Sequence, residues 1–140
     1  MKNITSLPLC ILFFCTFSNL TNAGQCALSG VTERNMRLSS YLHSQTASSF
    51  RVKCDRAYNI RFRSVNLVNS KGNSFVSNGS KRIPTFMRIE GADKSEWNTL
   101  LSPRNSHDNK FSVIVELTEK PNVNAPAGTY TDKIYIDLFF

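Results

Sequence analysis

Apolar and polar residues alternate through the last eleven positions of the chain, from Tyr130 to Phe140. Strand geometry places every second side chain on the same face, so this pattern predicts a β-strand with one buried face. A shift of one residue in register would turn Tyr135 and Phe139 inward instead. The residues expected to face inward are Tyr130, Ile134, Ile136, Leu138 and Phe140.

This final strand is expected to leave an apolar edge uncovered, because the sequence offers no later segment to lie beside it. Exposed apolar edges invite pairing with another strand. We therefore expect a neighbouring strand, either from residues 25–42 of this chain or from another protein. The choice between these two sources decides the function.

Upstream segments predict further strands. Alternation over residues 50–54 and 58–62 indicates two strands joined by residues 55–57, or one long bent strand, and strands are also expected at 85–89 and 111–117. Asn78-Gly79 suits a tight hairpin turn, and residues 25–49 predict one or two short irregular strands. Trp97 is expected to pack on the sandwich. With no sustained helical periodicity, seven or so short strands predict an all-β fold, an antiparallel β-sandwich.

Residues 1–23 have the organisation of a secretory signal peptide. Lys2 precedes an apolar run over residues 7–17, and small residues stand at the positions that determine cleavage after Ala23. The mature domain is therefore expected to span residues 24–140. Cys26 and Cys54 are its only cysteines and predict one disulfide in an oxidising compartment.

The chain carries 17 Lys and Arg against 10 Asp and Glu, and loss of Lys2 with the signal leaves a net charge of about +6. Arg51, Lys53, Arg61 and Arg63 alternate outward on the two strands around Cys54 and could form a basic stripe that binds an acidic glycan. The competing interpretation is that these charges simply keep a β-sandwich from associating. We expect no nucleic-acid partner.

The sequence shows no recognisable catalytic, metal-binding or cofactor-binding signature. His43 and His107 are far apart and belong to no Ser/His/Asp or Cys/His pattern. The two mature cysteines and two distant histidines also lack zinc-ligand spacing. We therefore expect no enzyme activity, no bound metal and no cofactor.

The segment Ala127-Gly-Thr-Tyr-Thr-Asp132 before the final alternation, and Phe50-Arg-Val-Lys-Cys54 leading into Tyr58-Asn-Ile60, resemble the spore coat protein U-like family. This family includes the pilins of archaic chaperone-usher fimbriae. Residues 85–97 are more loosely similar, and together these segments cover about half of the mature chain.

The resemblance implies an incomplete immunoglobulin-like sandwich that lacks its final strand. A periplasmic chaperone would lend that strand, an outer-membrane usher would assemble the subunits, and the N-terminal extension of a neighbouring pilin subunit would later replace the chaperone's strand. Tyr130, Ile134, Ile136, Leu138 and Phe140 would then contact the chaperone or donor strand. The protein would travel through the periplasm to a fimbria on the cell surface.

The sequence departs from the pilin pattern at its N-terminus. Only Gly24 and Gln25 lie between the expected cleavage site and Cys26, whereas polymerising pilins carry a donor extension there. We therefore expect a terminal, tip position, or a role outside a polymer. The alternative hypothesis is a self-contained secreted sandwich, completed by residues 25–42, that binds an anionic ligand or a host or surface glycan through its basic face.

Overall fold

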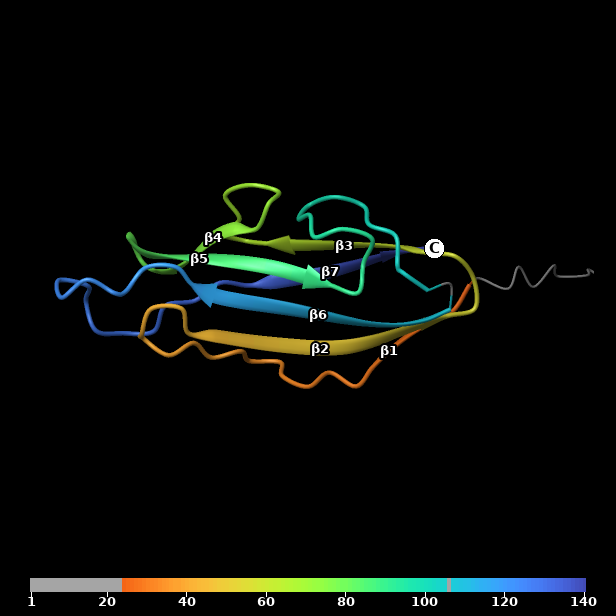
Figure 1. The fold of residues 1–140 in the computed structure, drawn as a ribbon, viewed down its shortest axis with the longest axis horizontal. Helices are drawn as coiled ribbons and strands as arrows, with labels where there is room; N and C mark the ends of the chain where they lie inside the picture. Colours follow the sequence, from red (N-terminus) through yellow and green to blue (C-terminus); the bar gives the residue numbers. More distant parts are fainter. Residues whose placement is uncertain (1–23, 106) are drawn as a thin grey trace, which may run out of the picture.

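The alternating segments of the sequence form antiparallel β-strands in residues 24–105 and 107–140, the part of the chain that this computed structural model describes (Figure 1). The predicted signal peptide, residues 1–23, lies outside the described residues. No helix within the described part is long and apolar enough to cross a membrane. The strands are β1 (Cys26–Ser29), β2 (Gln45–Cys54), β3 (Asn59–Ser64), β4 (Asn73–Asn78), β5 (Lys81–Glu90), β6 (Asp108–Leu117) and β7 (Ile134–Phe139).

Two sheets make the sandwich. One sheet has five strands in the order β1-β2-β6-β5-β4, and the other pairs β3 with β7. Figure 1 shows β7 passing behind the larger sheet. The predicted all-β, immunoglobulin-like antiparallel sandwich is confirmed.

The two segments around Cys54 are separate strands that lie in different sheets, because β2 belongs to the five-stranded sheet and β3 to the two-stranded one. The predicted hairpin is also present between β4 and β5. Asn78 still pairs with Lys81, so the turn consists of Gly79 and Ser80, one residue later than Asn78-Gly79. Gly79 has a φ of 60°, a conformation that glycine adopts at little steric cost.

The core between the sheets is aromatic. Phe62 lies 6.1 Å from Phe111 and 6.0 Å from Trp97, measured between ring centroids. Trp97 is fully buried, and its indole Nε1 donates a hydrogen bond to the Met87 carbonyl oxygen at 3.2 Å. The packing role predicted for this tryptophan is confirmed.

The predicted disulfide joins Cys26 and Cys54. The two cysteines are direct partners in the register of β1 and β2, so the bond holds β1, the edge strand of the larger sheet, against β2. Residues 30–44 follow β1 without forming a further strand.

Candidate functional site

One edge of β7 has no strand beside it among the described residues. Its other edge pairs with β3 over six residues, from Asn59 opposite Phe139 to Ser64 opposite Ile134. The backbone groups of one edge of β7 are therefore available to a further strand.

The direction of these backbone groups follows from the pairing. Val65 donates its N–H to the Lys133 carbonyl oxygen at 3.0 Å, and in an antiparallel ladder every second pair along the strands bonds in the same way. Bonds between β3 and β7 therefore fall on Tyr135, Asp137 and Phe139. Consistently, Ile60 on β3 turns its own N–H and carbonyl away from β7, toward Leu101. The N–H and carbonyl groups of Ile134, Ile136 and Leu138 thus point to the open edge.

The inward face of β7 is also incompletely covered. Ile134, Ile136 and Leu138 pack against the core but stay partly exposed. Their cross-strand partners on β3 behave differently, because Ile60 opposite Leu138 and Phe62 opposite Ile136 are both 0% exposed. The cover of the core therefore ends at β7, as expected for a sandwich that lacks a strand at this edge.

The opposite lip of this opening is formed by β1 and residues 30–44. Thr32 donates its N–H to the Ser49 carbonyl oxygen at 3.0 Å, so the segment runs along the edge of β2. Met36 and Leu38 turn inward and pack against the core. Within the described residues this segment pairs with β2 and not with β7, so the alternative that residues 25–42 complete the sandwich beside β7 does not hold in this structure.

The strand is shorter than predicted, and Phe140 lies outside it. The ladder ends at Phe139, and Phe140 is 58% exposed, so the prediction that it faces the core is wrong. Beyond the last ladder pair, strand geometry no longer fixes the direction of a side chain. Phe140 instead lines a cleft of about 600 Å³ beside the disulfide, together with Cys26, Ala27 and Cys54. We call the open edge of β7, its inward face and this cleft the acceptor groove.

Tyr130 also lies outside β7, which begins at Ile134, so the prediction of a continuous strand from residue 130 is wrong. Its hydroxyl donates to the Pro126 carbonyl oxygen at 2.9 Å. The next residue, Thr131, exchanges two backbone hydrogen bonds with Ser77 on β4. The chain therefore touches the edge of the larger sheet before it crosses to β3, and this crossing delays the start of β7.

Asp132 holds this crossing in place, a role that the sequence analysis did not assign. Its carboxylate accepts hydrogen bonds from the hydroxyls of Ser64 and Ser74 and from the backbone N–H of Asn66. These contacts join the ends of β3, β4 and β7. The only sequence signal was the Asp at the end of the Gly-Thr-Tyr-Thr-Asp segment.

The outward face of β7 carries an ion-pair cluster with β3. Asp137 accepts hydrogen bonds from Arg63 Nε at 2.6 Å and from Arg61 Nε at 3.2 Å. The hydrogen bond from Arg63 holds the pKa of Asp137 below its ordinary value, with a smaller contribution from Arg61, while partial desolvation opposes the shift. The guanidinium groups of Arg61 and Arg63 also lie over the rings of Phe139 and Tyr135.

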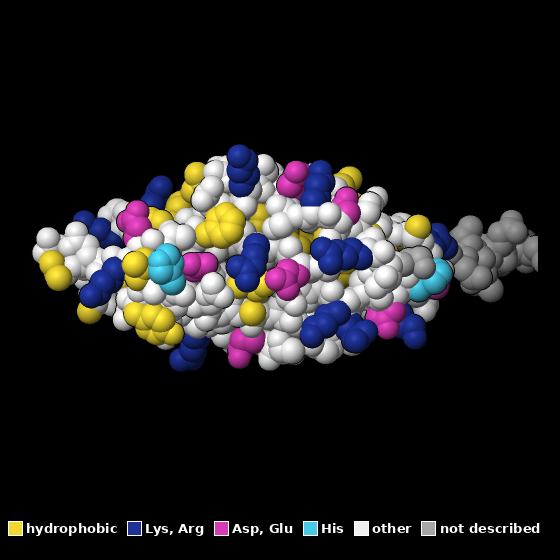
Figure 2. Space-filling view, in the orientation of Figure 1, with side chains coloured by type: hydrophobic (Ala, Val, Ile, Leu, Met, Phe, Trp, Pro, Cys, Tyr) yellow, Lys and Arg dark blue, Asp and Glu magenta, His cyan; other side chains and the backbone are white. Residues whose placement is uncertain are grey.

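The structure does not bring the four predicted ligand-binding cations into one stripe. Arg51 and Lys53 lie on β2, while Arg61 and Arg63 lie on β3 in the other sheet. Arg51 pairs with Asp108 at 3.2 Å, and the other two arginines share Asp137. Figure 2 shows Lys and Arg interspersed with Asp and Glu on the face in view.

No protein-family model and no curated protein matches this sequence. Among solved structures, the fold resembles a chain of the chaperone–tip adhesion subunit pre-assembly complex from the archaic chaperone-usher Csu pili of Acinetobacter baumannii, with a TM-score of 0.54 and 14% sequence identity. The match covers 84% of this chain and 40% of that one. At this identity the likeness shows a shared fold.

Proposed function

We propose that this protein is a structural or adhesive subunit of a chaperone-usher fimbria whose sandwich is completed by a strand from another protein. The observation that carries the proposal is the contrast across one ladder: Ile60 and Phe62 on β3 are fully buried, while Leu138 and Ile136 opposite them stay partly exposed. An added strand would cover these side chains and pair with the open backbone edge. Main-chain hydrogen bonds would supply affinity, and alternate side chains would supply specificity.

The proposed partners are a periplasmic chaperone, an outer-membrane usher and neighbouring pilin subunits. Two observations favour these partners over an unrelated protein that donates a strand. The Gly-Thr-Tyr-Thr-Asp ending and the segment around Cys54 resemble archaic chaperone-usher pilins, and the fold resembles a chain in a chaperone–pilus subunit complex. The proposed role is non-catalytic, and it places the protein in the periplasm and then on the cell surface.

We also propose a terminal position in the fimbria. Cys26 is fixed in β1 by its disulfide, and only Gly24 and Gln25 separate it from the expected cleavage site. Such a subunit would accept a strand and have almost nothing to donate. Mass spectrometry of the exported protein tests this, and a mature chain that begins a dozen residues or more before Cys26 would contradict it.

The main experiment is export of the full chain to a bacterial periplasm with and without the candidate chaperone, followed by size-exclusion chromatography and thermal melting. We expect soluble protein only as a one-to-one complex with the chaperone. A monomer that is stable alone and melts cooperatively would refute the proposal and favour a self-contained binding module.

A further inference from the structure

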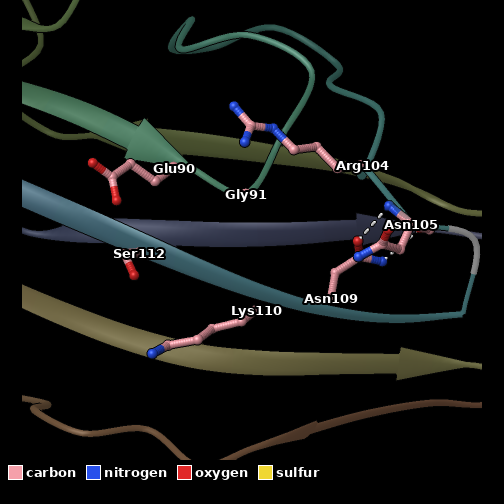
Figure 3. Close-up of a pocket in the computed structure, with 7 residues that line it drawn as sticks. All are labelled: Glu90, Gly91, Arg104, Asn105, Asn109, Lys110 and Ser112. Carbon is pink, nitrogen blue, oxygen red and sulfur yellow. Dashed lines mark hydrogen bonds between the residues drawn. The ribbon is translucent and has the colours of Figure 1, made fainter.

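A polar cleft of about 380 Å³ lies on the outer face of the five-stranded sheet, where β5 ends beside β6 (Figure 3). Glu90, Lys110 and Ser112 line it, and on their strands they alternate with buried apolar residues, which shows that they face outward. Its volume falls in the range of small-molecule sites. Because the acceptor groove lies between the sheets at β7, the two sites are separate.

The floor of the cleft depends on Gly91, which ends β5 with a φ of 98°. A side chain there would collide with the carbonyl oxygen of Lys110. Glycine therefore allows the backbone to pass close to β6 at the floor of the cleft.

Arg104 is fixed at one wall of the cleft. Its backbone N–H donates to the Gly91 carbonyl oxygen at 3.3 Å, and its Nε donates to the Ala92 carbonyl oxygen at 3.1 Å. These two bonds hold the side chain beside Gly91, as Figure 3 shows. Within the described part of the chain, no hydrogen bond or ion pair occupies its two terminal guanidinium nitrogens, so they are available to a ligand.

A second wall is held by Asn109, which is only 1% exposed. Its Oδ1 accepts the backbone N–H of Asn105 at 2.7 Å, and its Nδ2 donates to the Asn105 carbonyl oxygen at 2.7 Å and to the Tyr58 hydroxyl at 3.0 Å. The backbone of Asn105 is therefore fixed where this residue lines the cleft. Both walls are prearranged, which lowers the entropic cost of binding.

The charge of the cleft favours an anion. Arg104 and Lys110 contribute two cations and Glu90 one carboxylate, which leaves one net positive charge. Arg88 adds a further positive charge, because it forms an ion pair with Glu90 at 3.7 Å, whereas the nearby Arg51 is paired with Asp108.

We propose that this cleft binds a carboxylated saccharide, such as a uronic acid residue of an acidic glycan. The planar fork of Arg104 matches a carboxylate through two parallel hydrogen bonds, and Lys110 adds a second cation. Glu90 accepts hydrogen bonds from sugar hydroxyls, and Ser112 and the Asn105 amide both donate and accept them. This inference gives the glycan partner a site that differs from the four basic residues expected from the sequence.

The test is calorimetric titration of the exported protein with D-glucuronate, using the protein alone or in its chaperone complex, with the chaperone alone as background. We expect saturable one-to-one binding, and binding at least tenfold weaker for the methyl ester, which lacks the charge. Arg104→Gln and Lys110→Gln should each weaken binding about tenfold or more. Lys81→Gln removes the same charge at the far end of β5 and should change affinity less than about twofold.

Several results would overturn the inference: no saturable binding, equal binding of the ester, equal binding of inorganic sulfate, or an equal effect of Lys81→Gln. Lys110→Gln leaves the hydrogen bonds of Arg104 intact, so it separates ligand contact from loss of the wall. All variants should form the chaperone complex at normal yield. Failure of glucuronate binding would therefore leave the strand-addition proposal standing. Failure to form the chaperone complex would likewise leave the glycan-binding inference standing.

Discussion

Replacing Ile136 with Asp tests the acceptor groove directly. Ile136 lies on the inward face of β7 opposite Phe62, which is 0% exposed, and its backbone groups point to the open edge. In the uncomplexed chain this side chain is partly exposed, so a carboxylate there would keep part of its hydration. Once a partner strand covers the position, the charge would be buried beside Phe62 with no cation to pair with it.

The expected effect is large. An unpaired charge left in an apolar interior costs about 4 kcal/mol, and each 1.4 kcal/mol changes a dissociation constant tenfold. The complex with the chaperone should therefore weaken about a thousandfold, which would abolish its recovery from the periplasm. The assay is affinity purification through a tagged chaperone, followed by size-exclusion chromatography.

Tyr135→Asp is the matched control, because it places the same charge one residue away on the outward face. Tyr135 is 45% exposed and lies near Arg63, so a carboxylate there stays hydrated and close to a cation. We expect a near-normal yield of complex from this variant. A normal yield from Ile136→Asp would refute the assignment of the groove. Loss of complex from Tyr135→Asp alone would show that the strand is shifted by one residue.

Three further changes test the supports of the groove, and each is measured on the complex with the chaperone, because the chain alone is not expected to be stable. Replacing Cys26 and Cys54 with Ser should lower the unfolding free energy by about 3 to 4 kcal/mol, since the bond closes a loop with a sequence separation of 28 residues; an unchanged urea midpoint would contradict this. Asp137→Asn should lower Tm at pH 7, and because the pKa of Asp137 is depressed, the difference from the native chain should vanish as pH falls through that lowered value. A Tm difference that grows in acid would be the opposite result. Asp132→Ala should cost about 1 to 3 kcal/mol, because it removes the acceptor shared by the hydroxyls of Ser64 and Ser74 and the backbone N–H of Asn66, and thermal melting at neutral pH measures it.

The face of β7 could be predicted from sequence because it depends only on the two-residue period of a strand. From that period, Ile134, Ile136 and Leu138 were correctly predicted to face the core. It failed at both ends for the same physical reason. Tyr130 and Phe140 alternate in phase with the strand, but neither is held in the ladder with β3, and without cross-strand bonds the alternation does not fix their direction.

The pairing between segments that lie far apart in the sequence could not be predicted from local patterns. Arg51 and Arg63 were correctly expected to point outward, yet they lie in different sheets because the chain changes sheet between β2 and β3. The carboxylate of Asp132 is similar, since the residues it binds come from β3, β4 and the loop between them. The cleft beside Gly91 also depends on the approach of β5 to β6, which local patterns do not encode.

The supports of β7 explain how its open edge would stay ordered for the proposed partner strand. At its start, Asp132 ties the chain to β3 and β4. Along its length, Asp137 joins two arginines of β3 on the outward face. Near its end, the disulfide of Cys26 and Cys54 fixes the opposite lip of the groove. A strand held this way loses little further freedom when a partner adds to its edge, so more of the binding free energy is retained as affinity. Loosening any one support should therefore weaken strand addition even where the inward face of β7 is unchanged.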